Sequence, residues 1–208
     1  MTEAQKKDSV LFCVNGIWND PDNVMAWTDR AEDYCENRGI RCKRFEPETN
    51  WTFRRMPWHL GKYANMAALM FQTTSQQRRF VLAHSFGCEI VLRAVDLSGL
   101  DFEVVILVQG AVTSDCARNR INHLLATNRV KRFVVTWSQN DSMLKLARFW
   151  PPWDFVLRPL GLVGPRNVAI ELRTGAIQWH QHRHSTMWHG DNFHGTMNMV
   201  FDECGFTA

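Results

Sequence analysis

Long apolar runs, secretion signals and clustered charge are all missing from this 208-residue sequence. No apolar run approaches the roughly 20 residues of a membrane-spanning helix, and the opening segment, MTEAQKKDSV, lacks the apolar stretch of a signal peptide. The net charge is only +3, and lysine and arginine are spread along the chain, so no footprint for nucleic acid is indicated. We therefore expect a cytoplasmic protein with no transmembrane segment and no nucleic-acid partner; its oligomeric state stays open.

Motifs for disulfide exchange and for metal binding are also absent. The six cysteines show no CxxC spacing, and several fall in apolar segments, so we expect free buried thiols in a reducing compartment. There is no HExxH, and no glutamate or cysteine lies among the histidines near the C-terminal end to complete a familiar ligand set. We expect no metal and no other cofactor. Those histidines are His180, His182, His184, His189 and His194.

Apolar runs typical of buried strands alternate with segments that have helical spacing. Hydrophobic residues make up 45% of the chain and charged residues 22%, which is ordinary for a globular protein. We expect residues 1–208 to form one domain, a three-layer α/β/α sandwich around a mostly parallel sheet of about six strands. The expected strands are 9–16, 41–47, 80–83, 104–110, 132–137 and 168–173, and the expected helices are 23–38, 58–77, 88–95, 114–128 and 192–204.

Sheets of this kind place their active sites at the carboxyl ends of the strands. The loops after residues 14, 84, 137 and 173 are therefore the places to look. The second of them contains Ala83-His84-Ser85-Phe86-Gly87, between a buried strand and an amphipathic helix. The pattern G-x-S-x-G marks a nucleophile elbow, in which small residues on both sides of the serine let strand and helix approach closely. Because alanine is small, this segment predicts Ser85 as a nucleophile.

A serine needs a histidine that takes its proton and an acid that orients this histidine. In this architecture the three follow in the order serine, acid, histidine. Asp141 lies in the loop after strand 132–137 and is the predicted acid. Asp115 is the second choice and Asp154 the third.

With Ser85 and Asp141 in this order, the chain resembles a small α/β-hydrolase of the esterase/lipase type. The resemblance spans nearly the whole sequence, although the first two strands of that family have no counterpart. In such proteins the catalytic histidine often opens a segment like His184-Ser185-Thr186-Met187-Trp188, which a helix follows. The resemblance therefore implies His184 as the base, with His189 as the alternative. His84 would be structural or would line the site.

The same resemblance implies an oxyanion hole made of two backbone N–H groups. One belongs to Phe86, the residue after the nucleophile. The other comes from the loop after the first strand, where similar hydrolases carry His-Gly and this chain has Asn15-Gly16. We expect Ile17 to donate there, with Trp18 as the alternate.

The sequence thus predicts a serine hydrolase that cleaves a small-molecule or lipid-like carboxylic ester or thioester. An acyltransferase would use the same triad, and a catalytically silent hydrolase-fold protein that binds a partner is the alternative of another class. The Trp- and Pro-rich segment 149–165 either covers an acyl pocket or packs on the edge of the domain.

Overall fold

The computed structural model describes residues 1–16, 27–47, 56–147, 159–164, 174–179 and 182–207. Six strands form one sheet in the order β2-β1-β3-β4-β5-β6, and all five neighbouring pairs are parallel. This confirms the predicted fold class, and the sheet is parallel throughout. The strands are β1 (Ser9–Val14), β2 (Arg41–Phe45), β3 (Arg78–His84), β4 (Phe102–Val108), β5 (Val130–Trp137) and β6 (Thr174–Gln178).

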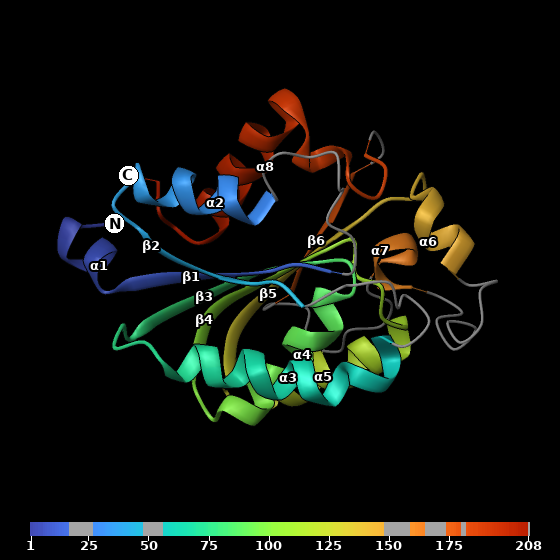
Figure 1. The fold of residues 1–208 in the computed structure, drawn as a ribbon, viewed down its shortest axis with the longest axis horizontal. Helices are drawn as coiled ribbons and strands as arrows, with labels where there is room; N and C mark the ends of the chain where they lie inside the picture. Colours follow the sequence, from blue (N-terminus) through green and yellow to red (C-terminus); the bar gives the residue numbers. More distant parts are fainter. Residues whose placement is uncertain (17–26, 48–55, 148–158, 165–173, 180–181, 208) are drawn as a thin grey trace.

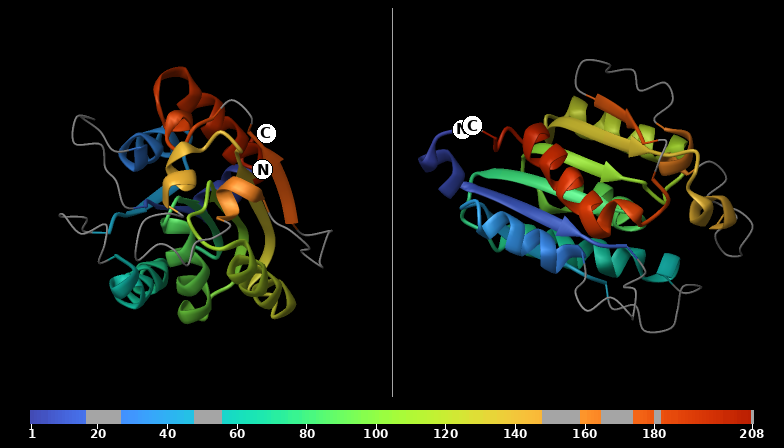
Figure 2. Two further views of the ribbon diagram at one scale, coloured as in Figure 1. Left: turned by 90° about the vertical axis from the view of Figure 1, so that its right-hand side faces the viewer. Right: turned by 90° about the horizontal axis from the view of Figure 1, so that it is seen from above.

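Helices cover both faces of the sheet (Figure 1). One face carries α3 (Met56–Gln72), α4 (Gly87–Ser98) and α5 (Ser114–Ala126), and the other carries α2 (Trp27–Glu36) and α8 (Gly190–Glu203). Seen from above, α8 and α2 lie over the same face of the sheet (Figure 2). The short helices α6 (Ser142–Ala147) and α7 (Leu160–Val163) lie at the carboxyl end of the sheet, while α1 (Glu3–Lys7) lies at the opposite end and η3 (Thr186–Trp188) precedes α8.

The helices on both faces of the sheet explain the continuous apolar runs of the central strands. Every residue of β1 is buried, because its alternate side chains point into two separate hydrophobic cores. Phe12 faces the α3–α5 layer, where its ring centroid lies 4.8 Å from that of Phe71. Leu11 and Cys13 face the α2–α8 layer. A strand with only one buried face would instead alternate apolar and polar residues.

The register of the sheet places the loops that follow its strands at one common edge. Val14 is level with Ala83, His84 with Val108, and Val108 with Thr136. The strand order reverses between the neighbours β1 and β3. The helix that follows β1, α2, covers one face of the sheet, and the helix that follows β3, α4, covers the other. Open α/β sheets bind ligands in the crevice at such a switch point. The loops that begin at Asn15 and Ser85 flank it.

The predictions for the last strand and for the segment 149–165 differ from the described chain or lie partly outside it. The sixth strand is 174–178, so the fourth loop of the carboxyl edge begins after Gln178; residues 168–173, expected to form that strand, lie outside the described residues. Of the segment 149–165, only 159–164 are described, and α7 lies there. That the chain forms one domain stays a prediction.

Candidate active site

Ser85 occupies a strained corner between β3 and α4. Its φ of 56° lies in the left-handed region, which costs a non-glycine residue on the order of 1–3 kcal/mol. Backbone hydrogen bonds hold this conformation: the Ser85 N–H donates to the Val108 carbonyl at 3.0 Å, and its carbonyl accepts from the Ala111 N–H at 2.9 Å. Strain that neighbouring backbone maintains in this way is typical of a nucleophile elbow.

Two glycines let the loop after β1 pass directly against this corner. A Cβ atom on Gly87 would lie 2.5 Å from the Val14 carbonyl oxygen and 2.7 Å from that of Asn15. A Cβ atom on Gly16 would lie 2.8 Å from the Cβ atom of Ser85. Neither position can hold a side chain unless the backbone shifts. The small residue on the other side of the serine, Ala83, is fully buried and packs in the α3–α5 core.

Asp141 lies after β5 and is fully buried. Its Oδ1 atom accepts a hydrogen bond from the Leu144 N–H at 2.9 Å, at the start of α6. Its Oδ2 atom lies 2.8 Å from the Nδ1 atom of His184. The helix start thus fixes one carboxylate oxygen and leaves the other aimed at the imidazole.

His184 bridges the acid and the serine. Its Nε2 atom lies 2.8 Å from the Oγ atom of Ser85, and its side chain is only 16% exposed. Because Nδ1 faces a carboxylate, the proton belongs on Nδ1, and Nε2 is left to accept the serine proton. The structure therefore places Ser85 and Asp141 each within hydrogen-bond distance of the His184 imidazole, at its two nitrogen atoms.

The alternative candidates lie elsewhere. Asp115 is in the first turn of α5, where its side chain is 76% exposed and pairs with Arg118. His189 is exposed and precedes α8. Asp154 lies outside the described residues.

The predicted oxyanion hole is described in part. Phe86 immediately precedes α4, and its nitrogen lies 3.1 Å from the position that a Gly16 Cβ atom would take. The Gly16 N–H donates to the Oδ1 atom of Asn15 at 2.8 Å, so this N–H group is already engaged within the loop. Ile17 and its alternate Trp18 both lie outside the described residues.

The sequence left open whether His84 is structural or lines the site, and the structure shows where its side chain lies. As the last residue of β3 it follows the alternation of Phe80 and Leu82, whose side chains enter the α2–α8 core. It is 6% exposed. Burial, helped by the neighbouring His184, lowers the pKa of His84 from 6.5 to about 3, so its imidazole is neutral at physiological pH.

Cysteines and histidines form no metal site in the described part of the chain. No group of three or more Cys, His, Asp or Glu side chains there is placed to hold an ion. The six cysteines are free thiols, and only Cys116 is exposed. No helix that the structure describes is long and apolar enough to cross a bilayer.

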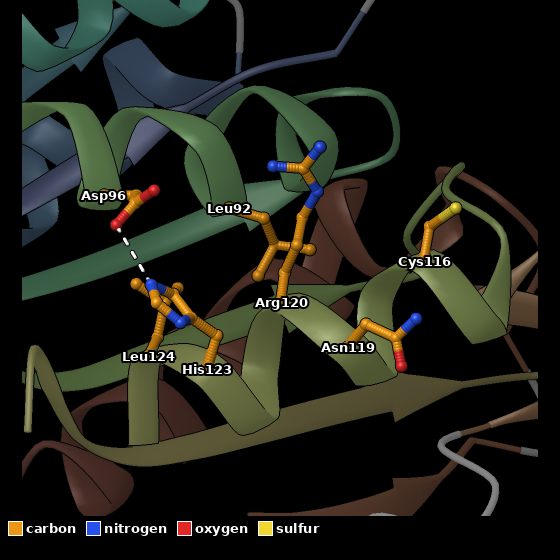
Figure 3. Close-up of a pocket in the computed structure, with 7 residues that line it drawn as sticks. All are labelled: Leu92, Asp96, Cys116, Asn119, Arg120, His123 and Leu124. Atoms are coloured by element: carbon orange, nitrogen blue, oxygen red, sulfur yellow. Dashed lines mark ion pairs between the residues drawn. The ribbon is translucent and has the colours of Figure 1, made fainter. Parts of the chain in front are cut away.

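A groove of about 340 Å³ opens between α4 and α5 (Figure 3). Leu92 and Leu124 contribute its apolar lining, and an ion pair of 3.5 Å joins the side chains of Asp96 and His123. Cys116, Asn119 and Arg120 complete the lining. It contains none of the candidate catalytic residues.

No protein-family model and no curated protein matches this sequence, but solved structures share its fold. Mouse alpha/beta hydrolase domain-containing protein 10 matches with a TM-score of 0.60 at 12% identity, over 96% of this chain and 90% of that one. MGS-MChE2, an alpha/beta hydrolase enzyme from the metagenome of sediments from the lagoon of Mar Chica, Morocco, matches with a TM-score of 0.56 at 12% identity, over 94% and 91% of the two chains. The chain therefore has the α/β-hydrolase fold, as the resemblance in its sequence implied.

Proposed function

We propose that this protein is a serine hydrolase that cleaves a carboxylic ester or thioester through an acyl-enzyme. The observation that carries the proposal is the pair of 2.8 Å contacts that link the Oγ atom of Ser85, the imidazole of His184 and the carboxylate of Asp141. Their order along the chain is the order that the hydrolase fold uses. The strained φ of Ser85 supports the same assignment.

In the first half of the reaction the Oγ atom of Ser85 attacks the carbonyl carbon, and Nε2 of His184 takes the hydroxyl proton. Asp141 stabilises the imidazolium that forms, through the hydrogen bond that Nδ1–H donates. The negative charge of the tetrahedral intermediate falls beside the backbone N–H of Phe86 at the start of α4. Ile17 would supply the second donor.

Collapse of the intermediate breaks the bond to the alcohol or thiol, and His184 returns its proton to that leaving group. The acyl group stays on Ser85 as an ester. Water then attacks this ester while His184 again acts as base, and the acid leaves with the serine regenerated. Apart from the substrate, only groups of the protein and water take part in these two steps.

A fluorophosphonate probe, which phosphonylates activated serines, tests the proposal directly. We expect the wild type to be labelled and to hydrolyse short-chain nitrophenyl esters, and Ser85→Ala to do neither while it keeps its melting temperature within a few degrees. Removing a triad member costs about 10⁴–10⁶ in turnover. Because the hydroxyl group is small, its removal should leave the fold intact, and Ser85→Ala serves as the inactive control.

Two outcomes would contradict the proposal. If the folded wild type reacts with neither probe nor esters, the protein is better described as a hydrolase-fold binding protein. If Ser85→Ala keeps wild-type hydrolysis, the nucleophile is another residue. Mass spectrometry of the labelled peptide identifies the modified serine.

A further inference from the structure

His84 contacts the backbone of the candidate base. Its Nε2 atom lies 2.7 Å from the carbonyl oxygen of His184. A carbonyl oxygen can only accept, so the His84 ring must carry its proton on Nε2 and donate it there. His84, which precedes Ser85 in the sequence, thus holds the main chain of His184, the residue that must deprotonate Ser85.

This contact acts where His184 has little other support from regular structure. Residues 182–185 lie between β6 and η3 and belong to neither. The side chain of His184 has to keep two contacts of 2.8 Å at once, to Ser85 and to Asp141. Displacement of its backbone by about 1 Å would break that geometry and can cost 10²-fold in rate.

The ring of His84 is itself fixed by its surroundings. It lies nearly perpendicular to the rings of Trp188 and Trp27, with centroids 5.5 Å and 6.4 Å away. These two indoles stack on each other at 4.2 Å. Trp27 donates through Nε1 to Asn15 at 2.7 Å, which ties the same cluster to the loop after β1.

The ring's protonation state suits this task. Its neutral form carries a single proton, and the 2.7 Å contact to the His184 carbonyl assigns that proton to Nε2. A charged ring would lie with its centroid 5.0 Å from that of His184 and would oppose the imidazolium that catalysis forms.

We propose that His84 is a positioning residue, which holds the His184 main chain by its Nε2–H···O bond so that the His184 imidazole spans Ser85 and Asp141. This role rests on the proposed hydrolase function and adds to it. His84 does not touch the reacting atoms and transfers no proton to them.

A matched pair of variants separates the hydrogen bond from the packing. In His84→Gln the amide nitrogen can take the place of Nε2 and donate, whereas His84→Met has similar length without a donor. We expect Met to lower kcat for nitrophenyl esters and the rate constant of fluorophosphonate labelling by up to about 100-fold, with KM within about twofold. Gln should restore both to within about fivefold of wild type. Equal rates for the two variants, whether both low or both normal, would overturn the role.

The wild type offers a second readout that needs no substitution. In ¹⁵N spectra of histidine-labelled protein at neutral pH, we expect His84 as the Nε2–H tautomer and His184 as the Nδ1–H tautomer. His84 found protonated on Nδ1, or charged, would overturn the positioning role even if Met at this position does not fold. An inactive, unlabelled wild type would instead remove the proposed hydrolase function, and the positioning role with it, so the two failures are told apart.

Discussion

The Oγ atom of Ser85 and the Nε2 atom of His184 lie 2.8 Å apart, although 99 residues separate them in the chain. Each belongs to a loop at the same edge of the sheet, one after β3 and one after β6. Two strands, β4 and β5, lie between β3 and β6 in the sheet. The close approach therefore depends on the contacts that hold residues 182–185 beside Ser85.

Replacing Asp141 by asparagine should lower kcat by about 10³–10⁴. The amide would present an N–H₂ group to Nδ1 of His184 and stabilise the wrong tautomer, while its oxygen could still accept from Leu144. Steady-state hydrolysis of a nitrophenyl ester measures the loss. Asp115→Asn is the control, because the exposed Asp115 pairs with Arg118 on α5, and its rate should stay within twofold of wild type. A large loss in Asp115→Asn alone would move the acid to α5.

The two candidate bases should respond very differently to removal. His184→Ala removes the imidazole that contacts Ser85 and Asp141, so both ester hydrolysis and fluorophosphonate labelling should fall by at least 10³-fold. His189→Ala removes an exposed side chain that makes no capping hydrogen bond to α8, so both rates should stay near wild type. The opposite ranking would show that the loop rearranges to present His189.

Gly87→Ala should be destabilising although the residue lies in the first turn of a helix. The new methyl group would meet the carbonyl oxygens of Val14 and Asn15, which belong to backbone and cannot move independently. We expect a loss of about 1–3 kcal/mol in the free energy of unfolding and at least a tenfold loss of activity as the loop after β1 withdraws.

Gly195→Ala is the matched helical control. A Cβ atom at Gly195 meets nothing within 4 Å in the middle of α8, so this change should raise the free energy of unfolding by about 0.5–1 kcal/mol. Urea titrations of the two variants beside wild type give the comparison. Equal effects of both substitutions would mean that the elbow tolerates a side chain at position 87.

The stability of the protein should fall as the pH drops below about 6.5. The pKa of His84 is about 3 in the folded protein and near its ordinary value of 6.5 in the unfolded chain. Between these values the unfolded state binds the extra proton, so the free energy of unfolding rises with pH, by at most about 1.4 kcal/mol per unit for this group. The pKa of His182 is lowered by burial too and acts in the same direction.

His84→Gln isolates this contribution, because glutamine does not titrate. Melting temperatures between pH 7 and pH 5 should fall more steeply for wild type than for His84→Gln. Carboxylates that titrate at lower pH affect both proteins alike. Parallel curves would mean that His84 takes up its proton as readily when folded as when unfolded.

The sequence by itself determined the layered parallel architecture and the corner at Ser85. Continuous apolar runs such as β1 can only be strands that are buried on both faces, and alternation with helical spacing then requires a parallel sheet covered on both sides. The small residues around Ser85 mark the close approach of strand and helix. These are local patterns, because periodicity and side-chain size act over a few residues.

Only the tertiary structure decided which histidine contacts Ser85 and which aspartate contacts that histidine. Asp141 and Asp115 both follow buried strands, and His184 and His189 are five positions apart, so the sequence ranked the members of each pair but could not decide between them. The register of the sheet and the hydrogen bond from the Leu144 N–H at the start of α6 aim Asp141 at His184, and the side chain of His84 contacts the main chain of His184. Such contacts join segments far apart in the chain, and they exist only once both cores are packed.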